Sequence, residues 1–168
     1  MRFLGLSIAA VAAAAVALSG CNKSASPPQD TSGQPSAPSS GGAMLTADQM
    51  KAAQAALPAP YNTADLSNGE SKFALCQTCH TLVEGGPNMT GPNLHGVFGR
   101  KAATKEGYNF SDALKAAGWT WDAAHLDTWI TDPKAAVPGT KMTFAGMKDP
   151  KDRTDTIAYL MVQTGYKP

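Results

Sequence analysis

Apolar residues at helical spacing are clearest near the end of the chain. Ile157, Leu160 and Met161 fall at positions i, i+3 and i+4, which places them on one face of a helix. Asp149 is a favourable N-cap residue, and Pro150 suits the first helical position because its missing N–H would be unsatisfied there in any case. The pattern therefore predicts that the last helix of the chain begins at Pro150.

Earlier stretches have the pattern of short helices separated by loops rich in Gly, Pro and Asn. Thr46 and Gln49 are spaced as a capping box, and Pro58 ends the helix that they begin. No run rich in Val, Ile and Thr precedes Cys76, so a strand is not expected there. The prediction is an all-α fold of helices and long loops. These helices are expected over residues 45–57, 66–75, 111–118 and 122–131.

The amino terminus has the composition of an export signal. One basic residue, Arg2, precedes an apolar, Ala-rich run that is shorter than the ~20 residues a membrane-spanning helix needs. The run ends in Leu-Ser-Gly-Cys at residues 18–21, which resembles a bacterial lipobox, so Cys21 is the expected site of acylation and attachment to the lipid bilayer. An ordinary cleaved signal or an uncleaved anchor are the alternatives.

Composition divides the rest of the chain. The residues after Cys21 are mostly Ser, Pro, Gly and Gln and cannot bury enough apolar surface to fold. Arg2 is one of 14 basic residues, so the chain from Cys21 onward has 13 basic and 13 acidic residues, and nucleic acid is not an expected partner. The expected organisation is a signal peptide at 1–20, a disordered tether at 21–43, a helical spacer at 44–61 and a folded domain at 62–168.

The strongest chemical signal is the pentapeptide Cys76-Gln77-Thr78-Cys79-His80. At this spacing two thiols can each bond a haem vinyl group while the next imidazole ligates the iron, which predicts covalently bound haem c with His80 as the first axial ligand. Half of a zinc site and a thiol-disulfide centre are the other interpretations. A zinc site would need two more ligands, and the only other cysteine lies in the export signal.

The second axial ligand must come from far along the chain. Met142 and Met147 lie in the loop between the predicted helices downstream of the haem motif, and a thioether favours ferrous iron. The pattern alone does not choose between them.

Three segments carry a resemblance to a known family. They read Gly-Pro-Asn-Leu-His-Gly-Val-Phe-Gly-Arg-Lys at 91–101, Pro-Gly-Thr-Lys-Met-Thr-Phe-Ala-Gly-Met at 138–147 and Asp-Thr-Ile-Ala-Tyr-Leu at 155–160. With them the chain resembles class I cytochrome c of the mitochondrial type over about residues 65–166. The resemblance implies the small cytochrome c fold, with helices and long loops wrapped around one haem, and it implies Met142 as the axial methionine, with Met147 as a packing or surface residue.

The resemblance also implies contacts around the haem. The carbonyl of Pro92 would accept the ring N–H of His80, which orients the imidazole. The other implied contacts are to the haem propionates, from Arg100, Trp121 and Thr140. Phe110 stands where the family has a tyrosine whose hydroxyl reaches a propionate, so that contact is missing here.

The implied function is electron transfer rather than catalysis. We expect a monomeric, monohaem carrier in the bacterial periplasm that takes electrons from a quinol-oxidising complex and delivers them to a terminal oxidase, with Lys134, Lys141, Lys148 and Lys151 as candidates for a docking ring. The alternative is a haem peroxidase or an electron-delivery subunit of one oxidoreductase, and a small-ligand sensor is a third possibility. The peroxidase and the sensor would each need an open iron.

Overall fold

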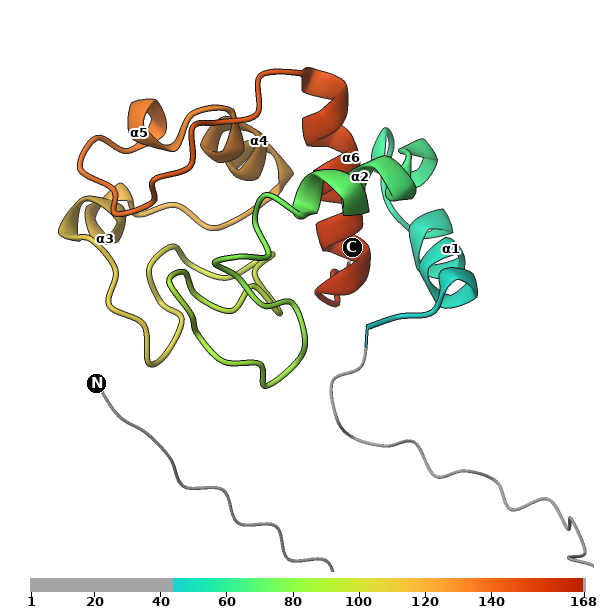
Figure 1. Ribbon diagram of the computed structural model, residues 1–168, viewed down its shortest axis with the longest axis horizontal. Coiled ribbons are helices and arrows are strands. Elements are labelled where there is room, and N and C mark those ends of the chain that lie inside the picture. Colours follow the sequence, from blue (N-terminus) through green and yellow to red (C-terminus); the bar gives the residue numbers. More distant parts are fainter. Residues whose placement is uncertain (1–43, 168) are drawn as a thin grey trace, which may run out of the picture. The chain divides into compact units, whose positions relative to one another are not determined.

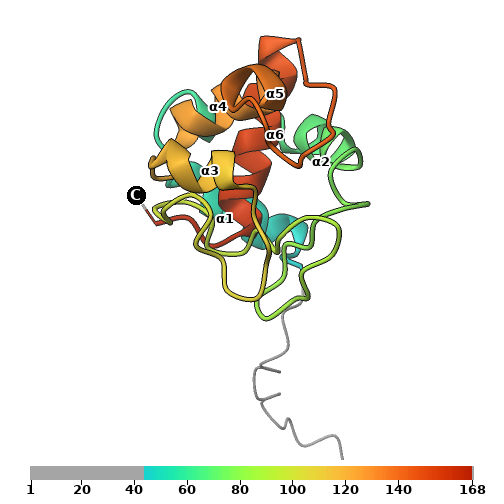
Figure 2. The same cartoon turned by 90° about the vertical axis from the view of Figure 1, so that its left-hand side faces the viewer.

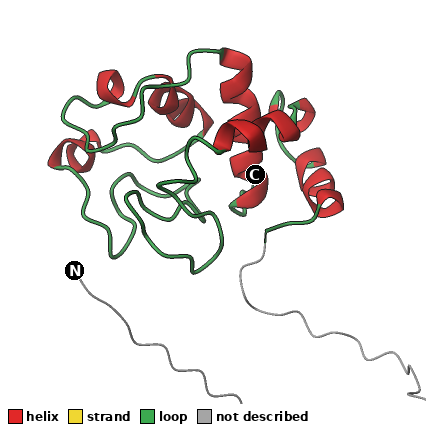
Figure 3. Cartoon of the chain, viewed as in Figure 1, coloured by secondary structure: helices red, strands yellow, loops and turns green. Residues whose placement is uncertain are grey.

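A computed structural model describes residues 44–167, which form helices and long loops, with no strand among them (Figures 1 and 3). The predicted signal, the tether and Cys21 lie outside the described residues. A single antiparallel bridge joins Lys101 and Thr120. The elements in chain order are α1 (Ala47–Ala55), the 3-10 turn η1 (Tyr61–Thr63), α2 (Leu66–Phe73), α3 (Asp112–Ala117), α4 (Ala123–Thr131), α5 (Pro133–Ala136) and α6 (Pro150–Gln163).

Side-chain caps decide where the helices begin, as the sequence predicts. Thr46 and Gln49 form the expected capping box at α1, and Asp149 accepts from the backbone N–H groups of Lys151 and Asp152 at α6. Asp65, Ser111 and Asp122 cap α2, α3 and α4 in the same way. The predicted helices are therefore confirmed, to within a few residues at their ends.

Helix α5 was not predicted. Pro133 does end α4 near Thr131, as expected, but it also lies in the first turn of α5, and the Asp132 side chain caps that turn through the backbone N–H of Ala135. A proline stops the helix before it and suits the start of the next one.

Helix α6 crosses α2 at close range, and both views show the two helices side by side (Figures 1 and 2). Gly69 makes the crossing possible, because a Cβ there would lie only 2.9 Å from Cβ of Tyr159 and would overlap the carbonyl of Asp155. The crossing positions the end of α2, and the Cys76–His80 motif follows directly from that end.

Another part of the surface of α6 is covered by residues 45–64, because α1 and η1 both contact this helix. Every residue from Asp155 to Gln163 is buried, so α6 has no solvent-exposed face over that length. Leu57 belongs to the main core, and Gln163 accepts from the backbone N–H of Leu45 at 3.3 Å while donating to the sulfur of Met50 at 2.8 Å. The expected spacer helix therefore packs against the folded domain instead of only lengthening a tether.

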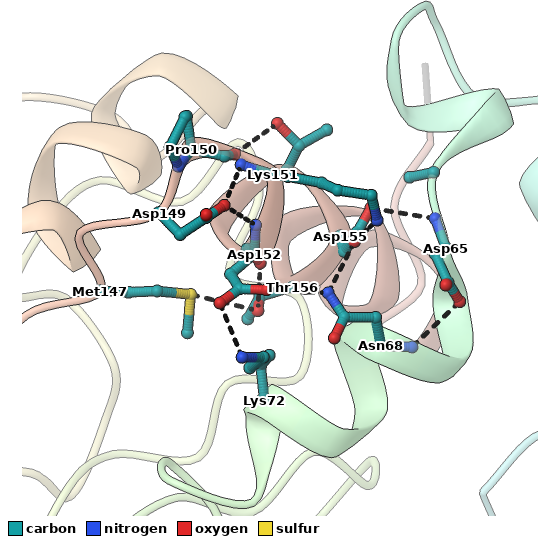
Figure 4. A network of polar contacts seen from close by, with 12 residues as sticks. Asp65, Asn68, Lys72, Met147, Asp149, Pro150, Lys151, Asp152, Asp155 and Thr156 are labelled. Carbon is teal, nitrogen blue, oxygen red and sulfur yellow. Dashed lines mark hydrogen bonds and ion pairs between the residues drawn. The ribbon is translucent and has the colours of Figure 1, made fainter.

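A buried carboxylate joins the start of α2 to the start of α6 (Figure 4). Asp155 accepts hydrogen bonds from the backbone N–H of Asp65 at 2.9 Å, from Asn68 Nδ2 at 2.8 Å and from Lys151 Nζ at 2.6 Å. Beside it, Lys72 pairs with Asp152 at 2.7 Å. The charge of Asp155 is thus compensated inside the helix crossing, as a buried charge requires.

Replacement of Leu57 by Ala tests whether the 45–64 segment is part of the core. Because Leu57 is only 7% exposed, Leu57→Ala should lower the free energy of unfolding by about 2–3 kcal/mol. Chemical denaturation measures this change in the free energy of unfolding. The control, Met44→Ala, alters a side chain that is 46% exposed, and should change stability by less than about 0.5 kcal/mol. Equally small changes in the free energy of unfolding for Leu57→Ala and Met44→Ala would mean that the 45–64 segment does not stabilise the domain.

Replacement of Asp155 by Asn tests the buried carboxylate. Burial opposes its ionisation, but hydrogen bonds from Lys151, Asn68 and the Asp65 backbone outweigh burial, so the pKa of Asp155 lies below its usual value. Its contribution to stability is therefore complete above an unfolded-state pKa of about 4 and is lost as the pH falls through the folded pKa. Asp155→Asn should cost about 2–3 kcal/mol at neutral pH.

Denaturation curves collected between neutral and acidic pH provide the second readout. Wild-type stability should fall on acidification more steeply than that of Asp155→Asn. Glu106→Gln, at an exposed loop position, is the control and should keep the wild-type pH profile. Parallel profiles for wild type and Asp155→Asn would contradict the role given to this carboxylate.

Candidate haem-binding site

One cavity of about 380 Å³ lies among α2, α3, α4, α6 and the loops that connect them. Its walls are largely apolar and aromatic, and its size is in the range of cofactor pockets. All eight predicted site residues within 44–167 line it. They are Cys76, Cys79, His80, Pro92, Arg100, Trp121, Thr140 and Met142.

The cysteine motif continues the turns of α2 into the cavity wall. The backbone N–H of Cys76 donates to the carbonyl of Phe73 at 2.7 Å, and that of His80 donates to the carbonyl of Cys76 at 3.0 Å. Both cysteines are free thiols. Burial, and secondarily the neighbouring Cys79, raises the pKa of Cys76 to about 11, so this thiol is protonated at neutral pH.

The arrangement does not match a zinc site. Among residues 44–167, no three His, Cys, Asp or Glu side chains are grouped so that they could hold a metal ion. Two thiols and one imidazole on the wall of an apolar cavity are instead suited to a porphyrin with vinyl groups.

The imidazole of His80 is held in one orientation. Its Nδ1 lies 2.7 Å from the carbonyl oxygen of Pro92, and because a carbonyl only accepts, Nδ1 carries the proton and Nε2 keeps its lone pair in the neutral ring. Burial lowers the pKa of His80, and the hydrogen bond to Pro92 only partly opposes this. Gly91 packs on the ring so closely that a Cβ there would overlap it. His80 is thus set up as a neutral ligand.

Met142 and Met147 both line the cavity but differ in their surroundings. Met147 is buried in the core, and its sulfur accepts from the hydroxyl of Thr156 at 3.6 Å. Met142 is only half-buried, on a loop that Thr140 holds by accepting the backbone N–H of Met142 at 3.2 Å. These contacts favour Met142 as the free thioether and Met147 as a packing residue.

Arg100 brings a positive charge to the cavity without a carboxylate partner among residues 44–167. Its guanidinium donates to the carbonyl of His95 at 3.0 Å and to that of Asn93 at 3.4 Å, and burial lowers its pKa. Trp121 is fixed beside it, because its backbone N–H donates to the carbonyl of Arg100. A half-buried cation with only neutral acceptors suits a site that takes an anionic group.

Some residues that line the cavity were not predicted, and among them are two with polar or charged ends, Lys105 and Tyr108. Lys105 and Tyr108 come from the loop before α3, and the hydroxyl of Tyr108 donates to the carbonyl of Thr90 at 2.5 Å. No motif marks them, because a loop of Lys, Glu, Gly, Tyr and Asn reads as ordinary solvent-exposed chain. Their position depends on how the loop folds back over the cavity.

The cavity therefore fits a haem in the chemistry of its donors. It combines two free thiols, a neutral imidazole, a thioether and an unpaired guanidinium within one apolar space. The sequence model for "Cytochrome c" matches residues 66–163, which is more than half of the chain. The chain belongs to the cytochrome c family.

Relatives of known identity agree with this assignment. A cytochrome c2 from Rhodoplanes tepidamans is 50% identical over 96 residues, which are 57% of this chain and 90% of the relative. A cytochrome c from Kluyveromyces lactis is 42% identical over 106 residues, 62% of this chain and 96% of the relative. The solved structure of cytochrome cH from Methylobacterium extorquens superposes with a TM-score of 0.54 at 52% identity, covering 58% of this chain and 97% of that one.

The expected fold class and cofactor are confirmed at the level of the family. Cytochromes c of this kind are electron carriers rather than enzymes, and they bind one covalent haem c, typically with His and Met as axial ligands. Among the residues that the structure describes, none of the helices is both long and apolar enough to cross a membrane.

Proposed function

We propose that this cytochrome c is tethered to a bacterial membrane on its periplasmic side and carries single electrons from a quinol-oxidising complex to a terminal oxidase. The tether would be residues 21–43, acylated at Cys21, and the carrier a monomer. The observation that carries the proposal is that one apolar cavity brings together the oriented imidazole of His80 and the thioether of Met142. With both side chains as ligands, the iron of a bound haem would have no open position.

Each residue in this proposal has a role of its own. Cys76 and Cys79 form the thioether bonds, His80 and Met142 bind the iron, and haem c when bound supplies reversible one-electron transfer. Pro92 keeps the proton on Nδ1 of His80, which leaves Nε2 as the lone-pair donor that would bind the iron. The remaining contacts, to the propionates, come from Arg100, Trp121 and Thr140.

Electrostatic steering toward a partner is expected to be weak. Lys148 lies 3.3 Å from Asp132, and Lys151 lies 2.6 Å from Asp155, so two of the four candidate ring lysines are already paired. Lys141 donates to the backbone carbonyl of Asn109 at 2.9 Å. A tether offsets weak steering, because it holds the carrier at a high effective concentration beside membrane partners.

The two methionines give a matched test of the iron ligands. Met142→Ala should abolish the weak red absorption band of the ferric protein and allow carbon monoxide to bind the ferrous protein, because the iron loses its sixth ligand. Met147→Leu removes a packing sulfur and should keep both wild-type properties. Optical spectra of the purified oxidised and reduced proteins measure this. The reverse result would assign Met147, and an open iron in the wild type would favour a peroxidase or a sensor.

Replacement of Cys21 by Ala tests the tether. The rate of oxygen reduction by membranes containing the carrier should fall by about tenfold or more, because the local concentration of carrier is lost. The midpoint potential should not change, since the haem surroundings are untouched. Ser24→Ala, which keeps the cysteine, is the control and should respire at the wild-type rate. Equal rates for the Cys21→Ala and wild-type proteins would remove the function given to the tether.

A further inference from the structure

Lys105 is an unusual lysine within residues 44–167. Lys72 and Lys105 are the two partly buried lysines of these residues, and Lys72 pairs with Asp152 at 2.7 Å. The ammonium of Lys105 has no carboxylate within ion-pair distance and no hydrogen-bond acceptor in the described part of the chain. A half-buried cation without a partner in the protein is unfavourable unless an added anion compensates its charge.

The wall around Lys105 contains no acid. The charged residues that line the cavity are Arg100, Lys105 and Lys141, and the other titratable ones are His80, Cys76, Cys79 and Tyr108. Arg100 and Lys141 each donate to backbone carbonyls. Lys105 is therefore the cation on this wall whose donors are all free for an added group.

The loop that carries Lys105 is held in place at several points. Thr104 Oγ1 donates to the carbonyl of Lys101 at 2.7 Å, and Asn88 Nδ2 donates to the carbonyl of Glu106 at 3.0 Å. The hydroxyl of Tyr108 donates to the carbonyl of Thr90, and the ring of Tyr108 packs edge-on against Phe110 at 4.7 Å. Lys105 is thus presented to the cavity by an anchored loop and not by a free end.

We propose that Lys105 binds a carboxylate of the haem, as a second cation beside Arg100. This rests on the haem site proposed above. Phe110, on the same loop, also lines the cavity but its side chain has no polar atom, and the hydroxyls of Thr104 and Tyr108 already donate to backbone carbonyls. Lys105 therefore supplies the free, charged donor of this loop. An ammonium–carboxylate contact is a charge-assisted hydrogen bond, stronger than a contact between neutral groups.

The proposal has a definite electrochemical sign. An uncompensated carboxylate near the iron stabilises the ferric state, which carries one more positive charge, so an ammonium that compensates it favours the ferrous state. The same contact favours the ionised carboxylate and lowers its pKa. Loss of Lys105 should lower the midpoint potential and move its pH-dependent region to higher pH.

The experiment is a redox titration of the full haem-loaded protein between about pH 5 and pH 9, the range in which such a carboxylate would titrate. Lys105→Gln should shift the ratio of oxidised to reduced protein about two- to fivefold toward the oxidised form at a given potential, and should shift the pH profile. Lys105→Arg should behave like the wild type because it keeps the charge.

Lys101→Gln is the matched control, since Lys101 is an exposed lysine of the same loop that does not line the cavity. It should leave both the midpoint and the pH profile as they are. Equal shifts for Lys101→Gln and Lys105→Gln, or an unchanged pH profile in Lys105→Gln, would overturn the proposal. Wild-type protein without covalent haem would instead overturn the haem site itself, so the two failures are distinguishable.

Discussion

The rest of the structure depends on the close crossing of α2 and α6. Gly69 lets the backbones approach, and Asp155 ties the start of one helix to the start of the other through the Asp65 backbone and Asn68. Cys76 follows within one turn of the end of α2, so the crossing determines where both thiols and the imidazole face the cavity. A change at Gly69 would therefore act on haem attachment without touching the haem site itself.

Charge is distributed to suit an anionic cofactor. On the outside, Lys72, Lys148 and Lys151 have carboxylate partners, whereas the cations on the cavity wall have none within residues 44–167. Buried charges are stable only when compensated. No Asp or Glu of the described part of the chain lines the cavity, and the carboxylates of a bound haem would supply the compensating negative charge. The haem would also fill the apolar space between α3, α4 and the cysteine motif.

The segment before α2 extends the domain beyond the part shared with the family. The family match begins at residue 66, but Leu57 is in the main core and Gln163 is held by residues of the α1 segment. Because this segment covers a face of α6, the helix is buried on all sides from Asp155 to Gln163 and has no solvent-facing side there. Any tether attached before Met44 would thus join the domain through a packed helix.

Local interactions made much of the molecule predictable from its sequence. Helix caps such as Thr46 and Asp149 act over three residues, and the Cys76–His80 spacing specifies thioether and iron chemistry within five, so the helices and the haem motif could be inferred directly. The docking of Met50 on Gln163 could not be inferred in this way. Met50 and Gln163 are 113 positions apart, and no local pattern relates residues at that separation. The sequence therefore determined the helices, the motif and the family. Only the tertiary structure decided which lysine on the cavity wall is free and how residues 45–64 close the core, because these depend on contacts between distant segments.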